Sequence, residues 1–528
     1  MKPRFGVRKY PIVVLFSIII SSVIAGLILI PSIWLILTAI TVPFTDLIAI
    51  LSRGKTIQIL INSVVMVSLT TVCAILIAVP LAFITTCSDI PYKRFWTVMV
   101  CLPLVIPSYI GAFAYVSTFG PYGTVQKMLF QFGVEELPSI YGLSGTVIVL
   151  TLYTYPYVYL TTRSSLKTLD PHAIDVSRTL GVSRWKTFSK LIWKQIYPAV
   201  IAGGLLVALY CLSDFGTPAI MRYDVFTRVI YIKRFDLGFS AILSLILLAL
   251  AIVILSIESK FHKSVSTTKK VDFKETFQIS FGKWRTLLIG FPLIISFFGI
   301  IIPLITFFGW FSLDPVSGNV FSIPYKHIFN SILVAFAAAL VITLSSTPIA
   351  HLIARKTPSW RGIIQKASYI GYAMPGVVIG LALIFFGSRY LGSYYQTLPL
   401  LIFAYVIRFF PLSIGSNVTA ISSVDLELVH ASRTLGMGPI RSFFKITFPL
   451  VTPSWLAGFS LVFLTVMKEL PITLMLRPTG FETLVTLIWK AEDANFYGDA
   501  ALPIVMLLIV SGLSMILLLM QEGPNAHE

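Results

Sequence analysis

Long stretches of this chain contain no charged residue. Asp, Glu, Lys and Arg are absent from 10–45, 56–88, 95–126, 137–162, 237–257, 286–313 and 500–521. A helix needs about 20 apolar residues to cross the roughly 30 Å hydrocarbon core of a bilayer, and every stretch is long enough. Buried β-strands are also apolar, but they are much shorter. The pattern therefore predicts membrane-spanning helices.

We place twelve spans along the chain. Their centres lie near residues 25, 72, 107, 150, 206, 248, 298, 341, 378, 409, 464 and 510. The apolar run behind the basic start "MKPRFGVRKY" is longer than the core of a signal peptide, so we interpret it as a retained first span. Only 12% of the 528 residues are charged, against roughly 25% in soluble domains. We expect an all-α polytopic membrane protein.

The positive charges predict the orientation of these spans. If the N-terminus is inside, 27 of the 40 Lys and Arg residues lie in cytoplasmic segments and 11 in outer loops. Positive charge marks the cytoplasmic side. We expect a multi-pass protein of the bacterial inner (plasma) membrane with both termini in the cytoplasm. The net charge of +18 is then a topology signal with the lipid bilayer as neighbour, and it requires no nucleic acid.

The pentapeptide "SRTLG" occurs twice, at Ser177–Gly181 and Ser432–Gly436. The similarity extends at the same spacing over 165–209 and 420–464, where Ala202-Gly203 matches Ala457-Gly458. Six spans followed by six in the same orientation form a parallel internal duplication. We therefore expect a first six-span repeat at 1–257, a cytoplasmic linker at 258–285 and a second six-span repeat at 286–528.

Each "SRTLG" copy lies in the cytoplasmic loop between the fourth and fifth spans of its half. We expect a helix, a left-handed turn at Gly181 or Gly436, and a second helix. In the first copy, Leu166, Leu169, Ile174 and Leu180 are expected to share an apolar side. A lipid-lying connector is one interpretation, but duplication at matching places favours docking to a partner with two equivalent sites.

These loops resemble a motif of the permease subunits of ATP-binding-cassette importers, an acidic residue and two alanines followed after three residues by glycine. His430 departs from the motif because it stands where Asp175 supplies the acid in the first copy. The resemblance implies the type I importer permease fold and loops that dock on the ATPase. The loop residues that it assigns to ATPase coupling are Asp175, Ser177, Arg178, Gly181, His430, Ser432, Arg433 and Gly436.

Within that family, the chain looks like the fused twelve-span iron(III) permeases of ferric-binding-protein-dependent systems. The stretches that carry this likeness are "SDFGTPAIM" at Ser213–Met221, "AYVIRFFPL" at Ala404–Leu412 and "MKELPITLMLRPTGFETL" at Met467–Leu484. The resemblance implies import by alternating access, a separate ABC ATPase subunit in two copies, and a periplasmic or lipoprotein substrate-binding protein. Similar fused permeases for thiamine, phosphonate or polyamine are the alternatives.

The chain has no phosphate-binding loop of its own. "RGKT" at Arg53–Thr56 carries Ala49 where a G-x-x-x-x-G-K-[ST] loop needs its first glycine. We therefore expect no ATP hydrolysis by this chain and no cofactor. A secondary carrier would not need two extended helix–glycine–helix loops, and a membrane transferase would need clustered acids such as D-D-x-x-D.

Four charged residues stand within spans or at their ends: Asp214, Arg408, Lys468 and Glu469. Such residues are candidates for a translocation path or gate, and carboxylate and phenolate oxygens suit iron(III). The alternatives are that Asp214 caps the next segment and that Lys468 and Glu469 form a local ion pair. We interpret Tyr153, Tyr155, Tyr157 and Tyr159 as an interfacial aromatic belt. The four cysteines and six histidines show no metal-ligand spacing, so the residues that contact metal stay unknown.

Overall fold

The computed structural model describes residues 12–134, 136–169, 171–266, 281–282, 285–311, 323–354, 364, 368, 371, 374–494 and 496–521. These residues are overwhelmingly helical, and no β-strand occurs among them. Helices are the expected solution, because every backbone N–H and C=O in hydrocarbon must find a partner within its own segment. The predicted all-α polytopic class is confirmed. Most of the predicted linker at 258–285 lies outside the described residues.

All twelve predicted spans have a helical counterpart. Ten helices in the described part of the chain are long and apolar enough to cross a membrane. An eleventh span, near residue 107, is a pair of helices bent by 92° between Val105 and Ser108. The twelfth, near residue 510, is an apolar helix described over Tyr497–Leu513.

The chain forms two compact units. The first-half unit comprises Thr41–Phe321 and Ala491–Ile504. Its α-helices are α2 (Phe44–Ser52), α3 (Gly54–Cys87), α4 (Lys93–Cys101), α5 (Ser108–Phe119), α6 (Thr124–Phe130), α7 (Leu143–Lys167), α8 (Pro171–Thr179), α9 (Arg184–Thr187), α10 (Trp193–Ser213), α11 (Gly216–Ile220), α12 (Phe226–Ile232), α13 (Leu237–Ser266), α14 (Arg285–Ser296) and α15 (Ile302–Trp310). A 3₁₀ turn, η1 (Leu102–Val105), and two π-helical turns, η2 (Phe188–Ile192) and η4 (Phe297–Ile301), complete it.

The second-half unit comprises Met1–Ile40, Ser322–Lys490 and Val505–Glu528. Its elements are α1 (Ile12–Ile40), α16 (Tyr325–Ala354), α18 (Gly376–Phe386), the π turn η5 (Gly387–Leu391), the 3₁₀ turn η6 (Gly392–Tyr394), α19 (Leu398–Ser423), α20 (Leu426–Thr434), α21 (Pro439–Ser442), the π turn η7 (Phe443–Thr447), α22 (Phe448–Met467) and α23 (Pro471–Leu476). Two helices cross the boundary between the units, α24 (Leu484–Asp493) and α25 (Tyr497–Gln521).

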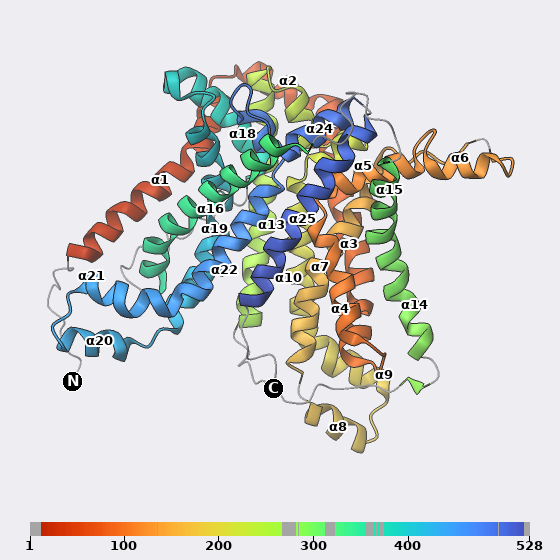
Figure 1. The fold of residues 1–528 in the computed structure, drawn as a ribbon, viewed down its shortest axis with the longest axis horizontal. Coiled ribbons are helices and arrows are strands. Elements are labelled where there is room, and N and C mark those ends of the chain that lie inside the picture. Colours follow the sequence, from red (N-terminus) through yellow and green to blue (C-terminus); the bar gives the residue numbers. More distant parts are fainter. Residues whose placement is uncertain are drawn as a thin grey trace. The chain divides into compact units, whose positions relative to one another are not determined.

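The units exchange one helical segment relative to the predicted repeats. The first span, α1, packs on α16 and α18 of the second-half unit, whereas α14 and α15 pack on α4 and α5 of the first-half unit. Their colours in Figure 1 mark this exchange, with red α1 beside blue-green helices and green α14 beside orange ones. The predicted boundaries of the two sequence repeats, 1–257 and 286–528, stay a prediction.

Paired glycines set the helix crossings at the centre of each unit. A Cβ on Gly203 of α10 would lie 2.7 Å from Val158 Cα of α7, and a Cβ on Gly458 of α22 would lie 2.4 Å from Ser416 Oγ of α19. Small residues let helix backbones approach closely where lipid removes any hydrophobic drive between spans. The two glycines belong to the matching Ala-Gly pairs of the duplication, so both halves pack their fourth and fifth spans in the same way.

Gly203→Ala should destabilise the protein, because the new methyl group meets the backbone of α7. Overpacking of this kind costs about 1–3 kcal/mol. The matched control is Gly290→Ala in α14, where a Cβ would meet no atom within 4 Å. We expect a lower thermal unfolding midpoint for Gly203→Ala in detergent and an unchanged or higher one for Gly290→Ala. Equal midpoints would contradict the crossing role.

Candidate transport gate and coupling loops

The first predicted acid, Asp214, directly follows the end of α10. Its Oδ2 accepts a hydrogen bond from the Thr217 backbone N–H at 3.1 Å, and its backbone carbonyl accepts one from Thr227 Oγ1 at 2.8 Å. The Ser108 hydroxyl donates to Asp214 Oδ1 at 2.9 Å. Asp214 therefore caps the short helix α11, as the alternative interpretation predicted, and ties it to the start of α5.

The second acid, Glu469, holds the equivalent place after α22. Its Oε1 accepts a long hydrogen bond of 3.4 Å from the Ile472 backbone N–H at the start of α23. Its backbone carbonyl accepts a bond from the Thr473 hydroxyl, whose Oγ1 also lies 2.7 Å from Tyr405 Oη. Each acid thus caps a short helix by accepting a hydrogen bond from the amide three residues further along the chain. The duplication therefore extends to the backbone of these short helices.

Arg408 of α19 is brought to Glu469, although 61 positions separate them in the sequence. Its Nε lies 3.5 Å from Glu469 Oε2, and the two side chains are only 16% and 8% exposed. Arg408 Nη1 is buried without a hydrogen-bond partner among the described residues. A Cβ on Gly376 would lie 2.6 Å from both Arg408 Nη1 and Glu469 Oε1. The glycine in "MPGVVIG" therefore leaves room for the ion pair.

Lys468, the fourth predicted gate residue, is half-buried at the end of α22. Its backbone N–H donates to the Thr465 carbonyl at 3.2 Å, which closes the last turn of the helix. Glu469 forms its ion pair with Arg408 of α19. Sequence reasoning found both of these residues but did not pair them, because pairing depends on how α19 packs against α22.

In each half, a polar cluster that the sequence did not indicate holds the far end of the segment that follows the acid. This segment runs from α11 to α12 in the first half and from α23 to α24 in the second. Asn330 Nδ2 of α16 donates to the Glu482 carbonyl at 2.9 Å, and the Leu484 N–H donates to Ser331 Oγ at 2.8 Å. Asn62 and Ser63 of α3 make the same two bonds to Asp224 and Phe226, at 2.9 and 3.1 Å. A repeated "NS" at positions 62 and 330 was the signal that could have revealed these clasps.

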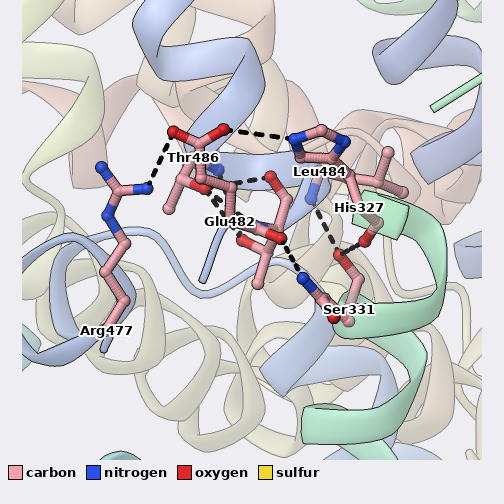
Figure 2. A network of polar contacts seen from close by, with 8 residues as sticks. His327, Ser331, Arg477, Glu482, Leu484 and Thr486 are labelled. Carbon is pink, nitrogen blue, oxygen red and sulfur yellow. Dashed lines mark hydrogen bonds and ion pairs between the residues drawn. The ribbon is translucent and has the colours of Figure 1, made fainter. Parts of the chain in front are cut away.

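Charges strengthen the clasp of the second-half unit. Figure 2 shows His327 and Arg477 on either side of the Glu482 carboxylate, at 3.2 Å and 3.3 Å. Burial disfavours the carboxylate, but hydrogen bonds from His327 and Arg477, with the charges of Lys490 and Arg477, bring the pKa of Glu482 below its ordinary value. The carboxylate is therefore ionised at neutral pH and can hold the loop between α23 and α24.

The two "SRTLG" loops form the predicted helix–glycine–helix. Gly181 and Gly436 follow α8 and α20 with φ of +71° and +81°. The Val182 N–H bonds to the Ser177 carbonyl at 3.1 Å, and the Met437 N–H to the Ser432 carbonyl at 3.0 Å. This is the left-handed helix ending that favours glycine. A Cβ at either glycine would meet no atom within 4 Å. Glycine is therefore favoured here by the positive φ and not by lack of space.

The serines of the motif face inward. Ser177 Oγ lies 3.0 Å from Thr187 Oγ1, and Ser432 Oγ lies 2.6 Å from Ser442 Oγ. Each pair ties the two short helices of its loop together. We therefore assign these serines to the shape of the loop.

The leucine of the motif faces outward. Leu166, Leu169 and Ile174 are buried, but Leu180 is 75% exposed and its counterpart Leu435 is 80% exposed. The prediction that Leu180 shares an apolar side with these three residues is wrong. Six positions separate it from Ile174, which places the two side chains about 120° apart around a helix of 3.6 residues per turn.

The remaining predicted loop residues are described only in part. His430 is exposed on α20. The side chains of Asp175, Arg178 and Arg433 lie outside the described part of the structure, although their backbone is helical.

Each loop is joined to a gate acid by continuous helical backbone. In the first-half unit α9, η2 and α10 run without a break from Arg184 to Ser213, where Asp214 follows. In the second-half unit α21, η7 and α22 run from Pro439 to Met467, just before Glu469. A helix of about 30 residues is about 45 Å long. Such a helix connects each loop to the acid that follows the far end of the span.

The predicted aromatic belt is wrong for three of its four tyrosines. Tyr153, Tyr155 and Tyr159 are buried within the first-half unit, and only Tyr157 is partly exposed. Tyr155 donates to the Val100 carbonyl at 2.8 Å, and Tyr159 Oη lies 2.9 Å from Thr85 Oγ1. Helix packing, which a run of alternating tyrosines does not reveal, places them in the core.

The fold and these sites define a polytopic, internally duplicated transport permease. The sequence matches the family of binding-protein-dependent transport system inner membrane components over residues 47–265 and 346–522. The chain belongs to this family, with one match in each half. It is therefore a multi-pass inner-membrane component of a binding-protein-dependent transport system.

Two of the relatives described next match most of the chain, and the third matches about a third of it. It is 29% identical over 503 residues to the Fe(3+)-transport system permease protein FbpB 2 of Haemophilus influenzae, covering 92% of this chain and 94% of the relative. It is 22% identical to the ferric transport system permease protein FbpB of Actinobacillus pleuropneumoniae, covering 88% and 72%. The molybdate/tungstate transport system permease protein WtpB of Pyrococcus abyssi is 29% identical over 34% of this chain and 71% of its own length.

The buried Arg408–Glu469 pair gives a testable prediction. Glu469→Gln keeps an oxygen for the cap but leaves Arg408 without its counter-charge, which costs about 3–5 kcal/mol for a buried pair. Arg408→Leu should cost a similar amount. The double variant Arg408→Leu/Glu469→Leu should lose less than the sum, because no unpaired charge remains.

The measurement is the thermal unfolding midpoint of each detergent-solubilised variant. Asp214→Asn is the matched control, since an amide oxygen can still accept a bond from Ser108 or Thr217. It should lower the midpoint less than Glu469→Gln does. Strictly additive losses in the double variant would show that the two residues do not act as a pair.

Proposed function

We propose that this chain is the membrane-spanning subunit of an ATP-driven importer for iron(III). A separate ATPase, in two copies, hydrolyses ATP, and a soluble or lipid-anchored binding protein delivers the substrate at the outer face. Both termini lie in the cytoplasm, on the side favoured by the positive charges. Two relatives that match most of this chain are named as iron(III) transport permeases, which supports the substrate.

The observation that carries this proposal is the pair of equivalent "SRTLG" loops, each at the start of a helix that ends beside Asp214 or Glu469. Closing two ATPase subunits on the two loops would move both helices together. That motion would convert an inward-open path into an outward-open one. We propose that Asp214, Arg408, Lys468 and Glu469 lie along that path or form its outer gate.

Other substrates are less well supported. The molybdate/tungstate relative matches only about a third of the chain. Thiamine, phosphonate and polyamine remain the alternatives within the same class of transporter. A secondary carrier is a further alternative, and transport in the absence of any ATPase would identify it.

Leu180 and Leu435 are the side chains that we expect to fill grooves on the ATPase. Replacing either leucine with Asp should reduce co-purification of the ATPase, because a charge would have to enter an apolar groove. The double variant should abolish both co-purification and ATP-dependent uptake. The purified chain alone should hydrolyse no ATP.

The matched control is Val134→Asp, which puts the same charge on an exposed residue in the loop after α6. Figure 1 shows α6 and α8 at opposite ends of the first-half unit, so this control should leave ATPase binding unchanged. Normal assembly of the Leu180→Asp/Leu435→Asp double variant, or ATP hydrolysis by the isolated chain, would contradict the proposal.

The two loops should dock by different forces. Asp175 carries a carboxylate that can pair with a cationic ATPase side chain, whereas the second loop has His430 at that place and no acid. Losing one partner of a desolvated charge pair costs about 2–5 kcal/mol. Asp175→Ala should therefore weaken ATPase association more than His430→Ala, and high salt should weaken the wild type in the same way. Equal losses with equal salt dependence would refute this asymmetry.

A further inference from the structure

Three oxygen-bearing side chains form a hydrogen-bonded chain at the outer end of α10. Tyr210 Oη donates to Ser108 Oγ at 3.1 Å, and Ser108 Oγ donates to Asp214 Oδ1 at 2.9 Å. Tyr210 and Asp214 are four residues apart and lie on one side of the helix end. Both are partly exposed rather than sealed in the core. A solute in the path could therefore reach the phenol and the carboxylate together.

Tyr210, Ser108 and Asp214 all offer oxygen atoms as ligands. Carboxylate, phenolate and hydroxyl oxygens are hard ligands, which favour small, highly charged cations. We propose that Tyr210, Ser108 and Asp214 form a transient binding station for a trivalent cation such as iron(III). This inference rests on the proposed function and names the residues that contact the substrate. Tyr210 was not among the candidates that the sequence offered.

Binding at the station is a proton exchange without a change of oxidation state. The cation displaces the phenolic proton of Tyr210, which passes to water, and an oxygen–metal bond replaces the O–H bond. The phenolate and the Asp214 carboxylate then offset two of the three positive charges. Ser108 holds the carboxylate in position and can itself turn its lone pairs toward the cation.

The second-half unit has the same backbone arrangement around its acid but different side chains. Thr465 and Gly376 stand where the first half has Tyr210 and Ser108, so both the phenol and the hydroxyl are missing. Arg408 pairs with the acid instead, so the carboxylate is already neutralised and attracts an incoming cation less. The duplicated gate therefore offers one cation station rather than two.

The station has few protein ligands, which suits weak, transient binding of a transported cation. Among the described residues, no three His, Cys, Asp or Glu side chains gather in a group that could hold a metal. Few protein ligands leave positions for water or a small chelator. A path must bind its cargo well enough to admit it and weakly enough to release it.

The test uses the full chain in lipid nanodiscs, titrated with ferric nitrilotriacetate. Iron(III) bound to a phenolate absorbs visible light by charge transfer, so the wild type should develop such a band. Tyr210→Phe should abolish the band, and Asp214→Asn and Ser108→Ala should each weaken the apparent affinity at least about tenfold. Tyr157→Phe is the matched control: its ring centroid lies 5.9 Å from that of Tyr210, and it should keep the band.

A band of equal strength in all variants would mean adventitious binding only and would overturn the station. The same holds if no band forms in the wild type. A parallel assay reconstitutes iron uptake with the ATPase and the binding protein. Uptake by the wild type with no loss in Tyr210→Phe would overturn the station and leave the proposed function intact. A wild type that imports no iron(III) would instead overturn the proposed function.

Discussion

A carboxylate that caps a short helix at the end of a long span fixes the geometry of each unit. Inside a bilayer, an interrupted helix exposes backbone amides that water cannot satisfy. Asp214 and Glu469 each accept one of these amides at the first turn of α11 or α23. The Asn-Ser clasps on α3 and α16 then hold the far side of the same segment. A segment held at both ends can turn inside the protein while its first backbone amide keeps a hydrogen-bond partner.

The two units share this backbone plan and differ in side-chain chemistry. Hydroxyl and amide donors hold Asp214, while a guanidinium holds Glu469. The difference follows from one position after a proline, because Ser108 reaches the acid and Gly376 makes room for Arg408. Duplication therefore preserved the architecture, and substitution at a few contact positions gave the two acids different partners.

Continuous helix joins the two "SRTLG" loops to Asp214 and Glu469. Each loop continues through a π-helical turn into the span that ends just before its acid, at matching places in both halves. The inward-facing serines and the left-handed glycines make each loop a compact unit. A force applied to the loop is therefore delivered along a helix axis, the stiffest direction that a polypeptide offers.

The sequence by itself determined the membrane class, the twelve spans, the duplication and the glycine turns. These features depend on the composition of contiguous segments, or on backbone preferences within a few residues. The tertiary structure alone decided which polar side chains meet. Ser108 reaches both Asp214 and Tyr210 because α5 packs against α11, and Arg408 reaches Glu469 because α19 packs against α22. It also decided that α1 packs with the second half, since helix exchange leaves no trace in the hydrophobic pattern: an apolar span can be buried equally well against either neighbour.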